Sequence, residues 1–202
     1  MSGTLFVISA PSGAGKTTLC RQLLKKNPDI KLSVSYTTRQ PRKGERNQID
    51  YTFISKSRFM KMIEKGEFAE WATVHGQLYG TSIKRLKALN RAGYDIILDI
   101  DIHGAMQLKK RYENAVYIFI LPPSAEVLKE RLVNRKTDSK DVIATRLDNA
   151  KREIPFYKDY DYIVINDKLD KAYKELESII ISSRLMTSRV DPNRIKKLYK
   201  IK

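Results

Sequence analysis

The architecture of this chain is predicted by the segment Leu5-Phe6-Val7-Ile8-Ser9-Ala10-Pro11-Ser12-Gly13-Ala14-Gly15-Lys16-Thr17-Thr18. It begins as an apolar run typical of a buried strand, continues as a loop of small residues, and ends where an amphipathic, helix-like stretch begins. A strand, such a loop and a helix in this order predict a phosphate-binding loop (P-loop), whose backbone N–H groups surround the phosphates of a nucleoside triphosphate. We therefore expect ATP to contact Ala10, Pro11, Ser12, Gly13, Ala14, Gly15, Lys16, Thr17 and Thr18.

Two residues of the P-loop have predicted chemical roles, and one departs from the usual pattern. Lys16 is placed to reach the β- and γ-phosphates, and the Thr17 hydroxyl to ligate Mg²⁺. Ala10 stands where the pattern G-x-x-x-x-G-K-[ST] begins with glycine. Alanine can replace that glycine if φ at this position is negative.

Size and composition indicate one globular domain with an anionic partner. The chain has 202 residues, of which 42% are hydrophobic and 31% charged, and its formal net charge is +16. No apolar run approaches a membrane span of roughly 20 residues, and the single cysteine, Cys20, fits a reducing cytoplasm. Basic residues are spread along the chain and concentrate only in 189–202, which argues for small nucleotides over nucleic acid. The sequence leaves open whether the chain is a monomer or a homodimer.

Short apolar runs alternate with helical patterns along the chain. Three runs resemble buried strands of a parallel sheet: Ile96–Ile100, Val116–Ile120 and Tyr162–Ile165. Between and after them we predict helices at Lys16–Lys26, Ser57–Lys65, Ser82–Ala92, Gly104–Lys110, Ser124–Asn134, Lys140–Glu153 and Asp170–Met186. This alternation predicts an α/β, doubly wound parallel sheet with ligands at the carboxyl ends of its strands.

Two long segments interrupt the alternation and suggest a division of the chain. Residues 33–81, which we call the insert, are rich in β-forming residues and hold one short helical pattern. Residues 135–153, the lid segment, are densely charged, as expected of a mobile cover over a phosphate site. The predicted P-loop core then comprises 1–32, 82–134 and 154–188, followed by the basic tail 189–202.

The insert contains a set of side chains suited to a nucleoside monophosphate. Arg39 and Arg42 carry planar guanidinium groups that can bind one phosphate bidentately. Tyr51 and Tyr79 supply hydroxyl donors for the same oxygens.

A carboxylate in the insert points to guanine as the base. Glu70 can accept two parallel hydrogen bonds, which matches the N1–H and 2-amino edge of guanine, whereas adenine presents a lone pair there. Thr81 can donate to guanine O6, and Ser35 can reach the ring edge. Taken singly these residues have ordinary structural explanations, but their combination downstream of a P-loop favours a binding site.

With these motifs the chain resembles the guanylate kinases, which make GDP and ADP from GMP and ATP, from about Leu5 to Arg184. The resemblance implies an enzyme of purine nucleotide metabolism whose co-substrates are ATP and GMP and whose cofactor is Mg²⁺. It implies that Asp101 joins the guanine contacts, that Glu45 orders the two arginines, and that Asp99 lies nearest the phosphates and the metal, directly or through water. It further assigns the transferring phosphates to Arg131, Arg135 and Arg146, and the adenine region to Asn166.

The expected reaction is direct in-line transfer, since a phosphate oxygen is already a nucleophile and needs no side-chain base. Catalysis would then rest on the positive charges of Lys16, Arg39, Arg131, Arg135 and Arg146. Gln48 stands where many relatives carry glycine, and the extension after Arg184 lies outside the family pattern.

Three alternatives remain open on sequence alone. A kinase for another nucleoside monophosphate would keep the P-loop but gives no reason for Glu70 and Thr81. A catalytically silent, guanylate-kinase-like binding module would typically have lost P-loop residues that this chain retains. A nucleic-acid-binding protein is supported by charge only.

Overall fold

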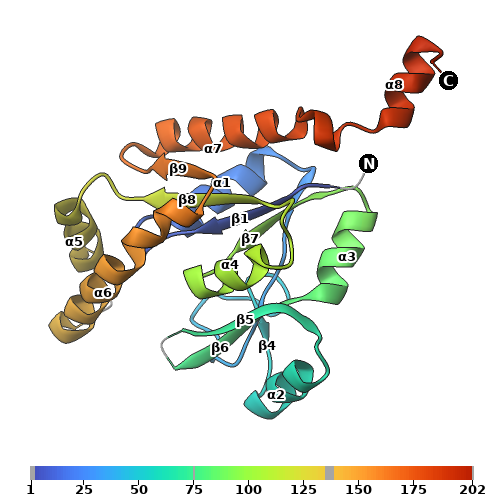
Figure 1. Ribbon diagram of the computed structural model, residues 1–202. Coiled ribbons are helices and arrows are strands. Elements are labelled where there is room, and N and C mark those ends of the chain that lie inside the picture. Colours follow the sequence, from blue (N-terminus) through green and yellow to red (C-terminus); the bar gives the residue numbers. More distant parts are fainter. Residues whose placement is uncertain (1–2, 75, 135–138, 202) are drawn as a thin grey trace.

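A computed structural model describes residues 3–74, 76–134 and 139–201. Its centre is a five-stranded sheet in the order β2-β7-β1-β8-β9, in which every neighbouring pair is parallel (Figure 1). The P-loop strand β1 is therefore the middle strand, paired on one side with β7 and on the other with β8. The strands are β1 (Leu5–Ser9), β2 (Ile30–Leu32), β7 (Asp95–Asp99), β8 (Val116–Leu121) and β9 (Tyr162–Ile165).

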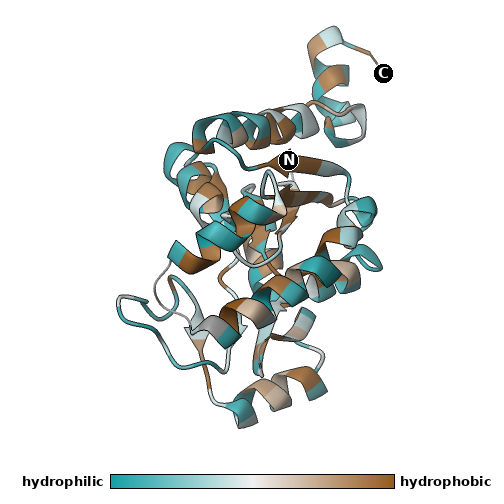
Figure 2. Cartoon of the chain, turned by 90° about the vertical axis from the view of Figure 1, so that its left-hand side faces the viewer, coloured by the Kyte–Doolittle hydropathy of each residue, from teal (hydrophilic) through white to brown (hydrophobic). Residues whose placement is uncertain are grey.

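Helices cover both faces of this sheet, as parallel strands require (Figure 1). On one face lie α1 (Lys16–Lys26) and α7 (Leu169–Arg184), and on the other lie α3 (Ile83–Arg91) and α4 (Ile102–Lys109). Figure 2 shows the hydrophobic colour concentrated on the central strands and the hydrophilic colour along outward helix faces. The predicted α/β doubly wound class is confirmed.

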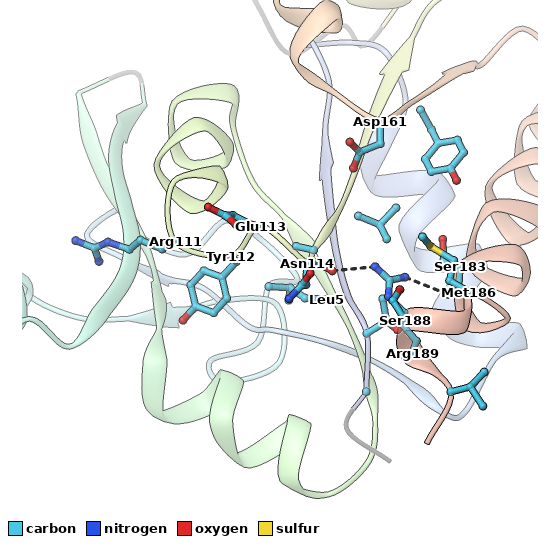
Figure 3. Close-up of a pocket in the computed structure, with 16 residues that line it drawn as sticks. Leu5, Arg111, Tyr112, Glu113, Asn114, Asp161, Ser183, Met186, Ser188 and Arg189 are labelled. Carbon is cyan, nitrogen blue, oxygen red and sulfur yellow. Dashed lines mark hydrogen bonds between the residues drawn. The ribbon is translucent and has the colours of Figure 1, made fainter. Parts of the chain in front are cut away.

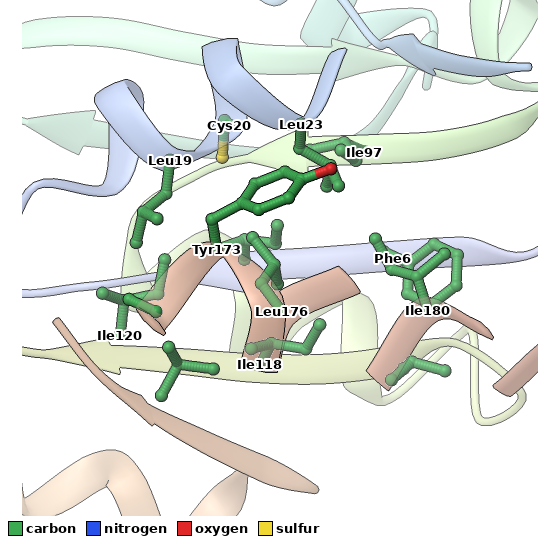
Figure 4. Close-up of a cluster of buried hydrophobic side chains, with 14 of the residues drawn as sticks. Phe6, Leu19, Cys20, Leu23, Ile97, Ile118, Ile120, Tyr173, Leu176 and Ile180 are labelled. Carbon is green, nitrogen blue, oxygen red and sulfur yellow. The ribbon is translucent and has the colours of Figure 1, made fainter. Parts of the chain in front are cut away.

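The larger core cluster fixes the position of the P-loop helix. Leu19, Cys20 and Leu23 of α1 face Tyr173 and Leu176 of α7 above the sheet (Figure 4). Each of these side chains is at most 5% exposed. Burying a side chain of this size contributes about 1.5–3 kcal/mol, so the helix that begins at Lys16 is firmly seated. Burial also raises the pKa of the Cys20 thiol, which packs as a small core side chain.

The insert forms a second, mixed sheet in the order β4-β3-β6-β5. Its hairpin pairs β5 (Phe68–Val74) antiparallel with β6 (Gln77–Ser82), and β3 (Tyr36–Thr37) lies between β6 and β4 (Thr52–Phe53). The helix α2 (Lys56–Glu64) packs Phe59 against this sheet. In Figure 1 the insert lies below α4, and α4 contacts β5.

The chain leaves and re-enters the sheet through α5 (Ala125–Asn134), α6 (Lys140–Glu153) and the 3₁₀ helix η1 (Ile154–Asp159). Beyond α7 the tail forms η2 (Thr187–Arg189) and a short helix α8 (Pro192–Tyr199) that projects from the body (Figure 1). None of the helices in the described ranges is long and apolar enough to cross a membrane.

Most predicted helices agree with the structure to within two residues at each end. Ser124 caps α5, its hydroxyl accepting the Val127 N–H at 3.2 Å. The prediction that Tyr162–Ile165 is buried on both faces is wrong, because β9 is an edge strand and only Val164 is buried. The short strand β2 and the tail helix α8 were not predicted from the sequence.

Candidate functional site

The P-loop lies between the end of β1 at Ser9 and the start of α1 at Lys16, at the carboxyl edge of the sheet. Gly13 and Gly15 have φ values of +95° and +91°, which favour glycine. A Cβ at Gly15 would also come within 2.3 Å of Asn166 Nδ2. Ala10 does not have a positive φ, which is the condition for alanine at that position.

Asn166 fastens the P-loop to the neighbouring edge of the sheet. The residue directly follows β9 and is buried, and its Nδ2 donates to the Ala14 carbonyl at 2.7 Å. Its own backbone N–H donates to Leu121 at the end of β8. The loop geometry is thus coupled to the strand ends on one side of β1.

Lys16 is folded toward the other side, onto the end of β7. Its Nζ lies 2.6 Å from Asp99 Oδ1 and donates to the Ile100 carbonyl at 2.6 Å. Burial alone would lower the pKa of Lys16, but the Asp99 carboxylate outweighs it and raises that pKa above its ordinary value. The ammonium group is therefore charged at neutral pH and already oriented by an anion.

A cavity of about 230 Å³ brings the P-loop and the insert together. From the core it is lined by the start of α1 and by the end of β7, and from the insert by side chains on or beside β3, β4, β5 and β6. The predicted site residues that line it are Lys16, Thr17, Ser35, Tyr51, Glu70, Tyr79, Asp99 and Asp101. Residues separated by more than 80 positions are thus brought together around one cavity.

The same cavity contains oxygen groups that suit a divalent cation. The exposed hydroxyl of Thr17 and the carboxylate of Asp99 both line it. Hard oxygen ligands with room for phosphate oxygens are what Mg²⁺ prefers. No group of three or more His, Cys, Asp or Glu side chains in the described ranges forms a self-contained metal site. The donors fit a metal held jointly by protein and nucleotide.

Glu70 is the buried acid of the cavity. Its side chain is 4% exposed, and Oε1 accepts the Thr81 hydroxyl at 2.5 Å. Burial raises the pKa of Glu70 to about 7, with Thr81 opposing and Asp101 adding to that shift. Asp101 itself caps α4, its Oδ1 accepting the Gly104 N–H at 2.8 Å. An acceptor pair of this kind can read hydrogen-bond donors on a base.

The arginine cluster of the insert is centred on Glu45. Arg39 forms a bidentate pair with it through Nη1 at 2.9 Å and Nη2 at 2.8 Å, and the Arg42 backbone N–H donates to it at 2.7 Å. The Arg39 guanidinium lowers the pKa of Glu45. Arg39 Nε donates to the Tyr79 hydroxyl, so the proton of that hydroxyl is available to an anion. The guanidinium also lies 5.3 Å from the centre of the Tyr51 ring.

A second cavity, of about 430 Å³, lies on the other side of the P-loop. The predicted ATP residues Gly13, Gly15, Thr18 and Asn166 line it, together with Arg131, which was predicted to bind the transferring phosphates. Nη2 of Arg131 donates to the Asp167 carbonyl, while its buried Nη1 has no hydrogen-bond partner in the described part of the chain. Such a nitrogen is suited to an anionic ligand.

Arg146 is not among the described residues that line either of these two cavities. Arg146 is half-buried on α6. Arg135 lies outside the described residues.

A third cavity, about 820 Å³, lies at the opposite edge of the sheet, and none of the predicted site residues is among the described residues that line it. It is bounded by the starts of β1, β8 and β9 and by the tail (Figure 3). Arg189 spans it, donating to the Asn114 and Ser183 carbonyls. Ligands of open parallel sheets bind at the carboxyl edge, so we assign the chemistry to the two smaller cavities.

Two residues near the site were not singled out from the sequence. Burial raises the pKa of Glu153, the last residue of α6, and the nearby Ser12 backbone N–H in the P-loop opposes that rise. Gln107 of α4 forms two hydrogen bonds with the backbone of Trp71, beside Glu70. Neither residue belongs to a local pattern, and only the packing of distant elements makes these contacts visible.

Comparison with known proteins gives one consistent family. The model of the guanylate kinase family matches residues 2–183. A guanylate kinase of Geobacter metallireducens is 56% identical over 188 residues, which cover 93% of each chain. One from Geobacter sulfurreducens is 53% identical over the same shares. A crystal structure of guanylate kinase from Anaplasma phagocytophilum matches with a TM-score of 0.82 and 32% identity, covering 100% of this chain and 97% of that one.

Proposed function

The chain belongs to the guanylate kinase family, and on that premise we propose that it transfers the γ-phosphoryl group of ATP to a phosphate oxygen of GMP. The observation that carries this proposal is the shared cavity in which Glu70 and Lys16 both take part. Glu70 offers a buried acceptor for a base, and Lys16 is a charged donor for phosphates. A substrate that joins a guanine to a phosphate spans the two.

We assign the guanine to Glu70 with Thr81, Ser35 and Asp101 around it. Ionised Glu70 accepts the N1–H and 2-amino protons, and the Thr81 hydroxyl, which bonds to Glu70 without nucleotide, turns toward O6. Adenine would place a lone pair against the carboxylate. A site built on such hydrogen bonds rejects analogues that lack them by about 10⁴-fold or more.

The GMP phosphate is assigned to Arg39, Arg42, Tyr51 and Tyr79. Glu45 holds Arg39 in place through the bidentate pair and fixes the backbone at Arg42. An arginine prepared in this way loses less conformational entropy when the phosphate binds. The acceptor oxygen is thereby positioned for in-line attack without a covalent enzyme intermediate.

ATP is assigned to the P-loop residues and Asn166, with Lys16 exchanging its contacts to Asp99 and Ile100 for the β- and γ-phosphates. Thr17 and Asp99 would hold Mg²⁺, which when bound neutralises phosphate charge. Arg131, Arg135 and Arg146 are assigned to the transferring phosphoryl group, where an arginine contributes about 10³-fold or more in related enzymes.

The proposed division of labour follows the proposed segments. The core (1–32, 82–134 and 154–188) binds ATP, the insert (33–81) binds GMP, and the lid segment (135–153) brings its arginines over both. Because water would compete with GMP as the acceptor, closure of the lid segment excludes it. We assign no catalytic part to 189–202.

The test is a coupled assay in which ATP and Mg²⁺ are offered with GMP, AMP, CMP, UMP or dTMP in parallel. We expect GMP to be used and AMP to be used at least about 10⁴-fold less efficiently. Failure to convert GMP would overturn the enzyme assignment, and equal use of AMP and GMP would overturn the assignment of the base to Glu70.

A further inference from the structure

The strand that carries Glu70, β5, has one edge without a neighbouring strand, and α4 lies beside that edge. β5 is the outer strand of the four-stranded sheet, so only β6 supplies it with backbone partners. An unpaired strand edge leaves N–H and C=O groups without a ladder. At Trp71, the residue after Glu70, a side chain of α4 takes the place of the missing strand.

That side chain is Gln107. Its Oε1 accepts the Trp71 N–H at 3.3 Å, and its Nε2 donates to the Trp71 carbonyl at 2.8 Å. A carboxamide that bonds to both backbone groups of one residue reproduces the pairing of a neighbouring strand. The contact therefore fixes both the position and the orientation of the peptide units flanking Trp71.

The backbone on the other side of Glu70 is irregular and has its own contact from the same region. The pairing register of β5 with β6 shifts between Phe68 and Glu70. Such a bulge redirects a side chain but weakens the local ladder. Nη1 of Arg111, two residues beyond α4, lies 3.4 Å from the Ala69 carbonyl at this bulge.

The geometry of α4 links Gln107 to the carboxylate itself. Gly104, one helical turn before Gln107 and on the same face, lies against Glu70. A Cβ at Gly104 would fall 2.5 Å from Glu70 Oε2 and 3.0 Å from Asp101 Oδ1. On one face of α4, Gly104 thus leaves room for the Glu70 carboxylate, and Gln107 holds β5, the strand that carries it.

We propose that Gln107 is a positioning residue for guanine selection: its clamp on Trp71 holds Glu70 in register with the N1–H and 2-amino group of GMP. The inference rests on the proposed function and adds to it a residue that touches no substrate. The same contact links the strand that carries Glu70 to the core, because α4 follows directly after Asp99 and Asp101 at the end of β7.

The test compares Gln107→Leu with Lys109→Met by measuring kcat and KM for GMP, for IMP, which lacks the 2-amino group, and for ATP. Gln107 is exposed, so its replacement leaves the core intact. Lys109 is the matched control, because it lies on the same helix and donates to a backbone carbonyl, that of Asp159, away from the insert. Gln107→Asn, whose amide is one methylene shorter, serves as a second variant should leucine disturb the local packing.

For Gln107→Leu we expect KM for GMP to rise about fivefold, as follows from losing two exposed hydrogen bonds, with kcat and KM for ATP unchanged. The preference for GMP over IMP should fall by a similar factor, because misplacing Glu70 removes the advantage of the 2-amino group. Gln107→Asn should shift both quantities in the same direction, and Lys109→Met should shift neither.

A folded Gln107→Leu protein with wild-type KM and wild-type preference for GMP would overturn the inference. So would a parallel loss of activity on GMP and IMP, which indicates a general structural role. The wild-type protein distinguishes the two failures. If it does not convert GMP, the proposed function fails. If it converts GMP and Gln107→Leu matches it in KM and in preference for GMP, only the role of Gln107 fails.

Discussion

The P-loop and the insert face one cavity but are held in place by different interactions. The P-loop joins two elements of the buried core, and its own shape depends on glycine conformations and on one buried amide, that of Asn166. The insert has strands as short as two residues, and its site is held by side-chain contacts such as the pair of Arg39 and Glu45.

This contrast matches what each region is proposed to recognise. Triphosphates are alike in all nucleotides, and backbone N–H groups on a rigid loop suffice to bind them. A base is distinguished by the placement of a few donors and acceptors, which side chains provide. The contrast predicts that substitutions in the insert alter the use of GMP and leave ATP binding intact.

The largest effect is expected for Glu70→Ala. Without the buried acceptor, the guanine donors lose their partner, and kcat/KM for GMP should fall about 10⁴-fold. ATP affinity, measured by calorimetry, should stay unchanged. Glu67→Ala is the matched control, because Glu67 is exposed on the same stretch of chain. Equal losses for GMP and ATP would remove the distinction between the two regions.

Arg146→Ala tests the lid segment. We expect kcat to fall about 10³-fold with little change in GMP affinity, because the assigned role is to stabilise charge that develops during transfer. Arg152→Ala on the same helix, where Arg152 is exposed and paired with Asp148, should retain activity. A large loss of GMP affinity with unchanged turnover would instead place Arg146 among the acceptor-binding residues.

Glu45→Gln tests how the insert holds its arginines. Loss of the charge-assisted bidentate pair should raise KM for GMP about 30-fold, the equivalent of a hydrogen bond to a charged group. Glu64→Gln, an exposed change at the end of α2, provides the control. An unchanged KM would show that Arg39 is oriented by Tyr79 and the aromatic rings alone.

The smallest effect, about tenfold per pH unit, concerns GMP affinity below pH 7. Because burial raises the pKa of Glu70 to about 7, acidification protonates the acceptor and weakens GMP binding. The GMP phosphate also takes up a proton near pH 6. Glu70→Gln is the control, because its GMP affinity should depend on pH through the phosphate alone. Identical pH slopes in the two proteins would contradict a role for ionised Glu70.

Local patterns predicted the core better than the edges. The P-loop helix was predicted at its observed bounds because its apolar spacing and its glycines are local features. The burial of β9 was mispredicted because a sequence of apolar residues does not show that its strand lies at a sheet edge. Gln48, which occupies a position of φ +64°, shows that a left-handed turn can form without the glycine expected there.

The candidate site residues could be named from the sequence, whereas the contacts that support them could not. Charge and donor type identified Glu70, Arg39 and Lys16 as candidates; Glu70 and Lys16 line one cavity, and Arg39 contacts Tyr79, which lines it too. Gln107 bonds to the backbone of a distant segment, and no local pattern marks a side chain that makes such a contact. Such contacts depend on tertiary packing.

The central claim is that the insert selects guanine through Glu70 while the P-loop is indifferent to the acceptor base. Its most direct test supplies wild-type protein, ATP and Mg²⁺ with equal concentrations of GMP and IMP and measures the two diphosphates formed. We predict that GDP exceeds IDP about 100-fold, since one donor to a buried carboxylate is missing in IMP. Equal amounts of GDP and IDP would contradict the claim.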